Sequence, residues 1–293
     1  MSCFADFAEI CQADVPLAPL TWYRLGGPAR WLLTPRTEAE LAAVVRRCRE
    51  NHIAGRVLGH GANVLVRDQG FDGAVIRLVG PAWEEVRWDD TLVIAAAGVD
   101  FPRLVKQSVE RGLSGLENLA GIPGTVGGLI RMNAGGKYGT IGQYTRAVRL
   151  LQPDGQIVTR GAAEVGFDYR HTDLGDSIVL EASFALRHDD RDATLQRYQT
   201  IWKEKAATQA ALGERSAGCI FKNPPGDYAG RLLDAADLKE CRIGGAEISP
   251  KHANFIVAHD GATAHNVIDL IDLARERVRQ NAGIDLELEV EIW

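Results

Sequence analysis

The sequence lacks the features typical of nucleic-acid-binding, membrane-spanning and metal-binding proteins. Acidic residues outnumber basic ones by 39 to 33, so the formal charge is −6 and no basic surplus favours a nucleic-acid partner. No apolar run approaches the ~20 residues that a membrane helix needs. The five cysteines are odd in number, no pair has metal-ligand spacing, and the seven histidines are dispersed. We therefore expect no metal site.

The beginning of the chain also lacks a targeting pattern. The first 20 residues contain Asp6, Glu9 and Asp14, and no basic segment leads into an apolar one. We therefore expect no secretory signal peptide, and we expect a cytoplasmic protein with reduced cysteines. The composition, 46% apolar and 25% charged, is that of an ordinary soluble protein, and 293 residues are enough for two domains.

Helical and strand patterns are mixed along the chain. Thr37 and Glu40 form a capping box before apolar residues at helical spacing, which predicts a helix over 38–51. Further helices are expected at 102–111, after the charged run 187–192, and at 264–282 between Thr263 and Gly283. Strands are expected at 55–58, 74–78 and 92–97, in a hairpin of 146–151 with 156–159, and at 285–293. This order predicts an α+β fold.

Two glycine-rich loops are candidates for binding a large, flat ligand. The loop Gly59-His60-Gly61-Ala62-Asn63 joins strand to strand, and Val64 stands where the dinucleotide fingerprint requires glycine. The second loop covers 115–136. Glycine allows a ligand to approach the backbone closely, and consecutive amides in such bends form anion-binding nests. The first loop alone is equally typical of a tight turn, but two such loops in one domain indicate an extended cofactor.

The segment 215–223, Arg-Ser-Ala-Gly-Cys-Ile-Phe-Lys-Asn, is the candidate substrate site. Small neighbours leave the thiol of Cys219 approachable, while Lys222 and Asn223 provide a cation and an amide for a polar, anionic substrate. An ordinary strand that leaves into the loop 224–226 is the alternative interpretation.

Together these segments resemble the UDP-N-acetylenolpyruvoylglucosamine reductases (MurB), the FAD enzymes of peptidoglycan synthesis, and in particular the shorter branch of that family. The resemblance covers nearly the whole chain, through segments 21–29, 59–66, 115–136, 169–170, 216–224, 251–255 and 286–290. It implies a two-lobed FAD-binding domain of the vanillyl-alcohol-oxidase (PCMH) type and a C-terminal α+β substrate-binding domain. We place the lobes at 1–80 and 81–190 and the substrate domain at 191–293.

The reaction implied by the resemblance is the NADPH-dependent, FAD-mediated reduction of UDP-N-acetylglucosamine enolpyruvate to UDP-N-acetylmuramate. A hydride passes from the flavin to the vinyl methylene carbon, and a proton is then delivered to the other vinyl carbon. This chemistry needs a cation at the enolic carboxylate and an acid near the vinyl carbon. The expected partners are NADPH and the UDP-sugar enolpyruvyl ether, with no nucleic acid, membrane or metal, and we expect a monomer.

The resemblance assigns three catalytic residues. Arg170 is expected to hold the enolic carboxylate through two parallel hydrogen bonds. Cys219 stands where many members have a serine that acts as general acid, and a thiol can deliver the same proton because its pKa of ~8.5 is far below that of a hydroxyl. Glu289 is expected to assist in stabilising or protonating the intermediate. Glu291 occupies a position where the family more often has a basic residue.

The resemblance also assigns contacts with FAD and with the substrate. Those with FAD are expected from Arg24, Gly26, Gly59, His60, Gly61, Ala62, Asn63, Val64, Gly115, Glu117, Ala120, Gly121, Pro123, Gly124, Thr125, Gly127, Gly128, Asn133, Ala134 and Gly135. Those with the substrate are expected from Lys222, Asn223, Lys251 and Asn254. Tyr23 either covers part of the flavin or packs in the core.

Two other functions stay open at this point. A flavin-binding or nucleotide-binding protein that has kept the fold without the chemistry is consistent with Cys219 in place of serine and with Glu291. An oxidase of the same superfamily with a covalently attached flavin is also consistent with the pattern, with His60 as the attachment point.

Overall fold

The computed structural model describes residues 3–208 and 213–293. The chain forms two compact units. Unit 1 comprises Met1–Ala13, Trp31–Gly59 and Gly73–Glu204, and unit 2 comprises Asp14–Arg30, His60–Asp72 and Lys205–Trp293. Each unit has its own hydrophobic core. The boundaries expected at residues 80 and 190 separate regions by the ligand that each is expected to bind. The compactness of the backbone does not test such boundaries, so they stay predictions.

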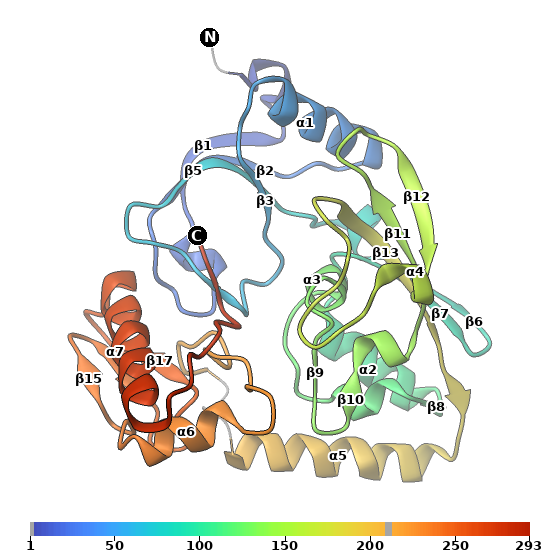
Figure 1. The fold of residues 1–293 in the computed structure, drawn as a ribbon. Helices are drawn as coiled ribbons and strands as arrows, with labels where there is room; N and C mark the ends of the chain where they lie inside the picture. Colours follow the sequence, from blue (N-terminus) through green and yellow to red (C-terminus); the bar gives the residue numbers. More distant parts are fainter. Residues whose placement is uncertain (1–2, 209–212) are drawn as a thin grey trace. The chain divides into compact units, whose positions relative to one another are not determined.

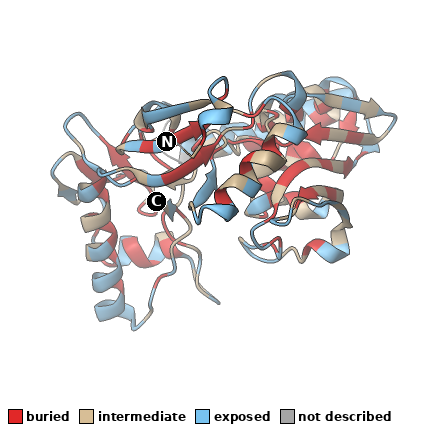
Figure 2. Ribbon diagram, turned by 90° about the horizontal axis from the view of Figure 1, so that it is seen from above, coloured by how far each residue is buried: buried red, intermediate tan, exposed pale blue. Residues whose placement is uncertain are grey.

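Unit 1 contains an antiparallel sheet of five strands in the order β12-β11-β13-β7-β6 (Figure 1). The strands are β6 (Val86–Asp89), β7 (Leu92–Ala96), β11 (Thr145–Leu151), β12 (Ile157–Gly161) and β13 (Ile178–Ala185). The pairing of β11 with β12 confirms the predicted hairpin. Helix α3 (Val126–Arg131) packs on β13, and α2 (Phe101–Glu110) buries Leu104, Val105 and Val109. Figure 2 shows burial along the ribbon; within this sheet, the central strands β7, β11 and β13 contain buried residues and the edge strands β6 and β12 contain none.

A second sheet has the order β1-β2-β5-β3 and consists of β1 (Cys11–Pro16), β2 (Pro28–Leu33), β3 (Gly55–Val57) and β5 (Phe71–Ile76). Helix α1 (Glu38–Glu50) connects β2 to β3. The helix begins where predicted, and the hydroxyl of Thr37 accepts a hydrogen bond from the N–H of Glu40 at 3.1 Å. The predicted capping box is only half formed, because the carboxylate of Glu40 accepts from the N–H of Arg36 at 2.6 Å and not from that of Thr37. Leu41, Val44 and Cys48 form its buried side.

Unit 2 is built on the antiparallel sheet β15-β16-β17 and the long helix α7 (Ala264–Ala282). The three strands are β15 (Arg242–Ile243), β16 (Ala246–Ile248) and β17 (Ile256–Ala258). Thr263 caps α7 and Gly283 ends it with a left-handed φ of 67°, as the sequence predicts. Ala246, Ile248 and Ile256 share a core with residues of α7. Because side chains alternate along a strand, Glu247 and Val257 lie on the other face of the sheet.

The remaining elements are short, apart from α5. They are α4 (Ala162–Val165), α5 (Arg191–Thr208), α6 (Ala229–Ala235), β4 (Val64–Leu65), β8 (Leu113–Ser114), β9 (Gly135–Gly136), β10 (Gly139–Thr140), β14 (Arg187–His188) and β18 (Glu291–Ile292), with 3-10 turns at Ala5–Phe7, Ala18–Leu20, Pro81–Trp83, Leu116–Leu119 and Ile141–Gln143. No helix among residues 3–208 and 213–293 is long and apolar enough to cross a membrane.

The prediction of a continuous closing strand over 285–293 is wrong, since only Glu291–Ile292 forms a strand, β18, in this stretch. The physical reason lies at Ile220, whose carbonyl accepts from the N–H groups of both Glu289 and Val290, at 2.8 and 3.3 Å. Two successive donors on one acceptor interrupt the alternation that a ladder requires. The apolar and polar alternation that suggested a strand reflects burial of Leu286 and Val290 in the core of unit 2.

Candidate functional site

Arg170 lies at the tip of a tight turn in unit 1. Asp168 and His171 pair across the turn, with N–H to carbonyl distances of 3.1 and 3.2 Å, so Tyr169 and Arg170 are the two central residues. Arg170 has a φ of 54°, which is uncommon for a residue with a long side chain. Its guanidinium carbon lies 5.3 Å from the centre of the exposed Tyr169 ring. The turn therefore presents a half-buried cation in a backbone conformation that other contacts must hold.

The loop after α3 provides such contacts. The side chain of Asn133 is buried, its Nδ2 donates to the carbonyl of Asp168 at 2.7 Å, and its Oδ1 accepts from the N–H of Gly142 at 3.1 Å. The hydroxyl of Thr172 donates to the carbonyl of Arg131 at 2.8 Å. Asn133, which was predicted to contact FAD, thus has both of its amide atoms bonded within the chain. It joins the loop of α3 to the turn that carries Arg170.

Glu117, another predicted FAD contact, is a buried carboxylate with several partners in unit 1. Its Oε1 accepts from the hydroxyl of Ser114 at 2.8 Å and from Nε and Nη2 of Arg197 at 3.1 and 3.0 Å. Its Oε2 accepts from the N–H of Gly115. Arg197 also donates to Asp189 at 2.6 Å. The carboxylate of Glu117 therefore fixes the first turn of the glycine-rich loop.

Gly59 and the start of α3 come together in the same unit. A Cβ on Gly59 would lie 2.5 Å from the hydroxyl oxygen of Thr125, so only glycine fits this close approach. The same hydroxyl accepts from the N–H of Gly128 at 3.4 Å. A Cβ on the exposed Gly128 would meet only that hydroxyl, at 3.5 Å, so protein atoms leave the space beside it open. A stretch of backbone that no side chain covers on one side, with a hydroxyl beside it, fits a flat, polar ligand such as FAD.

The other predicted FAD contacts of this loop differ in exposure. Gly115, Ala120 and Gly124 are buried, whereas Gly121, Pro123, Gly127, Ala134 and Gly135 are half-buried. The half-buried stretches are therefore the part of the loop that a ligand reaches most directly.

In unit 2, the loop 60–64 is bonded to the last segment of the chain. The Nδ2 of Asn63 donates to the carbonyl of Glu289 at 2.8 Å, and the carbonyl of Asn63 accepts from the N–H of Glu291 at 3.0 Å. Strands β4 and β18 continue this contact in parallel register, with Val64 opposite Glu291. His60 and Ala62 are half-buried and Gly61 is buried. The loop is thus bonded to the backbone at Glu289 and at Glu291.

The motif with the first glycine pair lies beside this loop. A Cβ on Gly26, which has a φ of 108°, would lie 2.5 Å from the Cβ of Val66, so packing within unit 2 requires glycine here. Arg24 is exposed with a φ of 53°. Tyr23 is fully buried in the core with Ala217, which settles its role in favour of core packing.

Cys219 and Glu289 lie on neighbouring segments of unit 2. The carbonyl of Ile220, next to Cys219, accepts from the N–H of Glu289 at 2.8 Å. Cys219 and Glu289 are both half-buried, whereas Glu287 and Glu291 are exposed. The structure therefore brings two of the predicted catalytic residues onto adjacent segments, and it distinguishes Glu289 from the two glutamates that flank it.

The substrate residues predicted near Cys219 have partners within unit 2. The Nζ of Lys222 lies 3.2 Å from Oε2 of Glu287, and the Oδ1 of Asn223 accepts from the N–H of Ala229 at the start of α6, at 3.0 Å. Both side chains lie at the surface of the unit, Lys222 half-buried and Asn223 exposed. They stay predicted substrate contacts.

Asn254 is in a different situation, because it is 2% exposed. Its Oδ1 accepts from the N–H of Phe221 at 2.9 Å, and its Nδ2 donates to the carbonyl of Phe221 at 2.8 Å. Its own carbonyl accepts from the N–H of Ile220 at 2.9 Å. The side-chain amide of Asn254 thus bonds to the segment of Cys219 as the backbone of a neighbouring strand would. Both of its polar atoms are hydrogen-bonded to the backbone of Phe221.

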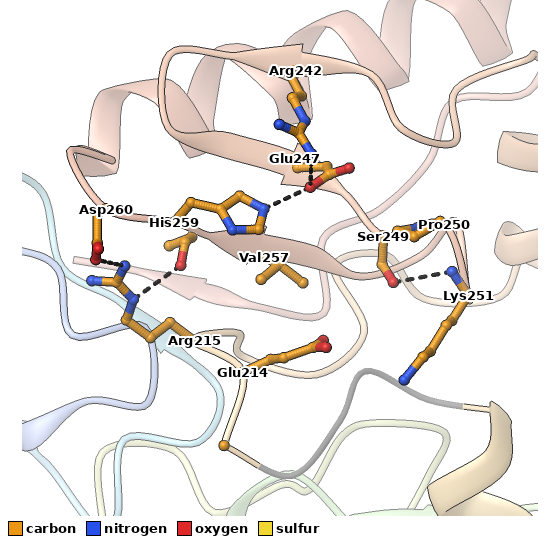
Figure 3. Close-up of a pocket in the computed structure, with 12 residues that line it drawn as sticks. Glu214, Arg215, Arg242, Glu247, Ser249, Pro250, Lys251, Val257, His259 and Asp260 are labelled. Carbon is orange, nitrogen blue, oxygen red and sulfur yellow. Dashed lines mark hydrogen bonds and ion pairs between the residues drawn. The ribbon is translucent and has the colours of Figure 1, made fainter.

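Lys251 lines a cavity of about 750 Å³ on the face of the small sheet opposite the core (Figure 3). Five polar side chains of its lining are joined by three contacts. Glu247 accepts from Nη2 of Arg242 at 2.8 Å and lies 2.6 Å from Nε2 of His259, and Arg215 donates to Asp260 at 2.7 Å. Burial raises the pKa of the Glu247 carboxyl, but the hydrogen bonds from Arg242 and His259 outweigh it and leave that pKa below the ordinary value.

The three side-chain amides that bond to the backbone at Asp168, Phe221 and Glu289 were assigned other roles from the sequence. No local pattern predicts such bonds, because the partners are separated by 35, 33 and 226 residues. Among residues 3–208 and 213–293, no group of three or more histidine, cysteine, aspartate or glutamate side chains is placed to hold a metal ion.

Comparison with known proteins gives matches over both regions of the chain. Residues 29–161 match the family described as FAD binding domain, and residues 209–293 match the family described as UDP-N-acetylenolpyruvoylglucosamine reductase, C-terminal domain. The UDP-N-acetylenolpyruvoylglucosamine reductase of Moorella thermoacetica is 40% identical over 279 residues, which are 95% of this chain and 91% of that protein. Reductase 2 of Symbiobacterium thermophilum is 41% identical over 294 residues, covering 100% and 94%.

Solved structures give the same result. The crystal structure of UDP-N-acetylenolpyruvylglucosamine reductase (MurB) from Thermus caldophilus superposes with a TM-score of 0.82 at 38% identity, over 95% of this chain and 97% of that one. The berberine bridge enzyme of Eschscholzia californica superposes with a TM-score of 0.51 at 16% identity, over 65% of this chain and 43% of that one. This second likeness concerns the fold alone. The α+β fold with a PCMH-type FAD-binding domain is thereby confirmed.

Proposed function

The chain belongs to the family of UDP-N-acetylenolpyruvoylglucosamine reductases, and on that basis we propose that it reduces UDP-N-acetylglucosamine enolpyruvate to UDP-N-acetylmuramate. FAD is its cofactor and NADPH its reductant. This oxidoreductase reaction belongs to peptidoglycan biosynthesis and so contributes to cell shape and division. We further propose that the protein acts as a monomer in the cytoplasm, on small molecules alone, without a metal, a nucleic acid or a membrane.

The residues proposed to hold FAD belong to three stretches of backbone. They are Arg24 and Gly26, the loop Gly59 to Val64, and the loop from Gly115 to Gly135. When bound, FAD carries two electrons from NADPH to the vinyl group. The open space beside Gly128 and the half-buried positions 121, 123 and 134 support this assignment. Glu117 and Asn133 serve the site through the backbone, because their polar atoms bond within the chain.

Arg170, Cys219 and Glu289 are the proposed catalytic residues. The guanidinium of Arg170 pairs with the carboxylate of the enolpyruvyl group and stabilises the negative charge that develops there. The thiol of Cys219 gives its proton to the vinyl carbon that bears this carboxylate, and the resulting thiolate regains a proton from solvent. Glu289 stabilises the charged intermediate or protonates it. Lys222, Asn223 and Lys251 are proposed to contact the uridine diphosphate side of the substrate.

One observation carries the assignment of the acids. Glu289 donates its N–H to the carbonyl of Ile220 at 2.8 Å, so the last segment of the chain and the segment of Cys219 are bonded to each other. Two residues that the family motif places 70 positions apart in this sequence therefore lie on neighbouring backbones.

The proposal is tested on the purified protein by its absorption spectrum and by acid precipitation. We expect flavin bands, release of FAD into the acid supernatant, and oxidation of NADPH that depends on the enolpyruvyl substrate. A protein that stays colourless after incubation with FAD contradicts the proposal. Colour that stays in the precipitate supports the covalent oxidase instead.

A further inference from the structure

The backbone beside each proposed catalytic residue is held by the side-chain amide of an asparagine. We propose that these amides are positioning groups, one for each catalytic residue: Asn133 for Arg170, Asn254 for Cys219 and Asn63 for Glu289. The inference rests on the proposed function and deepens it, since it concerns how the same three side chains are aimed.

All three catalytic residues lie outside regular secondary structure. Arg170 is in a turn, and Cys219 and Glu289 are on irregular segments. Such residues have no continuous ladder of backbone hydrogen bonds to fix the direction of the side chain. Because a misplacement of about 1 Å can cost ~10²-fold in rate, some other contact must hold the backbone.

Asn254 provides the closest hold. It bonds to both polar backbone groups of Phe221, at 2.9 and 2.8 Å, and its carbonyl accepts from Ile220 at 2.9 Å. Only one residue, Ile220, separates Phe221 from Cys219. The amide is only 2% exposed, so its loss removes the partners of two backbone groups of Phe221 in the interior.

Asn133 holds the turn of Arg170 from one side. It is 4% exposed and links the carbonyl of Asp168, at the first corner of the turn, to the N–H of Gly142. The hydrogen bond to the carbonyl of Asp168 at 2.7 Å restrains the first residue of the turn. Arg170, with its left-handed φ, follows two residues later.

Asn63 holds the segment of Glu289. Its Nδ2 donates to the carbonyl of Glu289 itself at 2.8 Å, while its own carbonyl accepts from Glu291 at 3.0 Å. These two contacts lie on either side of residue 290, in the peptide unit that begins at Glu289 and in the next one. The amide therefore limits rotation of the backbone that carries the carboxylate.

Asparagine suits this role for a chemical reason. Its planar amide offers one acceptor and two donors, so it can bond to a backbone N–H and a backbone carbonyl at the same time. Aspartate has the same shape and keeps only the acceptor. Asn→Asp therefore replaces the donor that faces a backbone carbonyl by an acceptor, and Asn→Ala removes every side-chain bond while the backbone carbonyls of Asn254 and Asn63 keep theirs.

Double-mutant cycles on the FAD-loaded protein test the proposal. The rate measured is reoxidation of the NADPH-reduced flavin by the enolpyruvyl substrate. We expect Asn254→Ala to slow this step about 10-fold to 100-fold while flavin reduction by NADPH is unchanged. In the Cys219→Ala background, Asn254→Ala should have no further effect, because a positioning residue acts only through the residue that it positions.

The matched control is the same substitution in the Arg170→Ala background, where the full effect of Asn254→Ala should persist. The corresponding cycles pair Asn133→Ala with Arg170→Ala and Asn63→Ala with Glu289→Ala. Equal effects of an asparagine substitution in all backgrounds overturn the proposal, because they indicate general loosening of the fold. Each Asn→Asp variant is measured in parallel, so the result does not depend on an alanine variant that folds poorly.

A second control is Asn266→Ala, which removes the amide that caps α7 by accepting from the N–H of Thr263 at 3.2 Å. It should lower thermal stability and leave both half-reactions unchanged. Alkylation by iodoacetamide needs no turnover, so it tests this proposal even if the proposed function is wrong. We expect the rate of alkylation of Cys219, measured by mass spectrometry, to change at least 3-fold in Asn254→Ala. An unchanged rate overturns the positioning role even in a chain that does not reduce the substrate.

Discussion

Units 1 and 2 hold their proposed catalytic residues in different ways. In unit 1, Arg170 lies in a turn whose end residues, Asp168 and His171, are three positions apart in the sequence and bond to each other. In unit 2, Cys219 and Glu289 lie on two segments that come from distant parts of the sequence and bond to each other at Ile220. The cation is therefore held mainly by local geometry, and the acids are held by long-range pairing.

This difference has a consequence for how each residue tolerates change. A tight turn forms mainly from its own four residues, so distant substitutions should alter its shape only where they remove an outside contact such as that of Asn133. The pairing of the last segment with residues 63 and 220 depends on contacts that close large loops. We therefore expect loss of activity from more distant substitutions in unit 2 than in unit 1.

The largest effect is expected from the thiol of unit 2. Cys219→Ala should slow reoxidation of the reduced flavin by the ~10²–10⁴-fold typical of a missing acid–base group. Cys219→Ser should stay substantially active, because a hydroxyl can deliver the same proton. Both rates are measured by rapid mixing without oxygen. Wild-type turnover in Cys219→Ala means that the thiol is a packing residue and that the proton comes from Glu289 or from water.

The next effect concerns the cation of unit 1. Removing one donor to a developing oxyanion typically costs ~10²–10³-fold, so Arg170→Ala should slow reoxidation by that amount. Bleaching of the flavin by NADPH should be normal, since the guanidinium acts on the enolpyruvyl carboxylate. The matched control is Arg170→Lys, which keeps the charge and loses the two parallel hydrogen bonds. Its rate of reoxidation should lie between those of wild type and Arg170→Ala. Normal reoxidation in Arg170→Ala removes Arg170 from the mechanism.

A smaller effect is expected when the free energy of unfolding is compared after loss of the partner of a buried charge in unit 1 and of a surface charge in unit 2. Arg197→Ala leaves the buried carboxylate of Glu117 with fewer donors, and we expect a loss of about 1.5–3 kcal/mol in the free energy of unfolding. Arg279→Ala breaks an exposed pair with Glu276 and should leave the free energy of unfolding nearly unchanged. Denaturant titration measures both. Equal losses contradict the structural role assigned to Glu117.

The smallest effect is a pH dependence in the cavity of unit 2. The pKa of Glu247 lies below its ordinary value of 4.5 in the folded protein, so its contribution to stability is present above about pH 4.5 and is lost as the pH falls through the lowered pKa. Its partners are exposed, and we expect at most about 1 kcal/mol. The stability difference between wild type and Glu247→Gln should be constant above about pH 5 and shrink as the pH falls below about 4.5, as denaturant titrations at each pH will show. A constant difference means that Glu247 does not titrate as described.

Local patterns in the sequence predicted the helices better than the closing segment. The capping box at Thr37, the cap at Thr263 and the stop at Gly283 are local signals, and each marks the end of a helix in the structure. The stretch 285–293 carries an equally regular alternation, yet most of it is irregular because the N–H groups of Glu289 and Val290 share the carbonyl of Ile220 and interrupt the pairing. Alternation reports which side chains are buried, and it does not report whether a partner strand exists.

The candidate site shows the same limit. Family motifs in the sequence point to Arg170, Cys219 and Glu289, and to the glycines that let loops approach one another, as at Gly59 and Thr125. The actual bonds of Glu117 and Asn254 could not be predicted in this way. Their partners Arg197 and Phe221 are 80 and 33 residues away, and only the folded chain brings them together.

The most direct test of the central claim is a single-turnover measurement without oxygen. The FAD-loaded protein is reduced with one equivalent of NADPH, the NADP⁺ is removed, and the reduced protein is mixed with UDP-N-acetylglucosamine enolpyruvate while flavin absorbance is recorded. The account predicts that the oxidised flavin spectrum returns and that one molecule of UDP-N-acetylmuramate forms per flavin. A flavin that stays reduced with this substrate, but is reoxidised when oxygen is admitted, contradicts it.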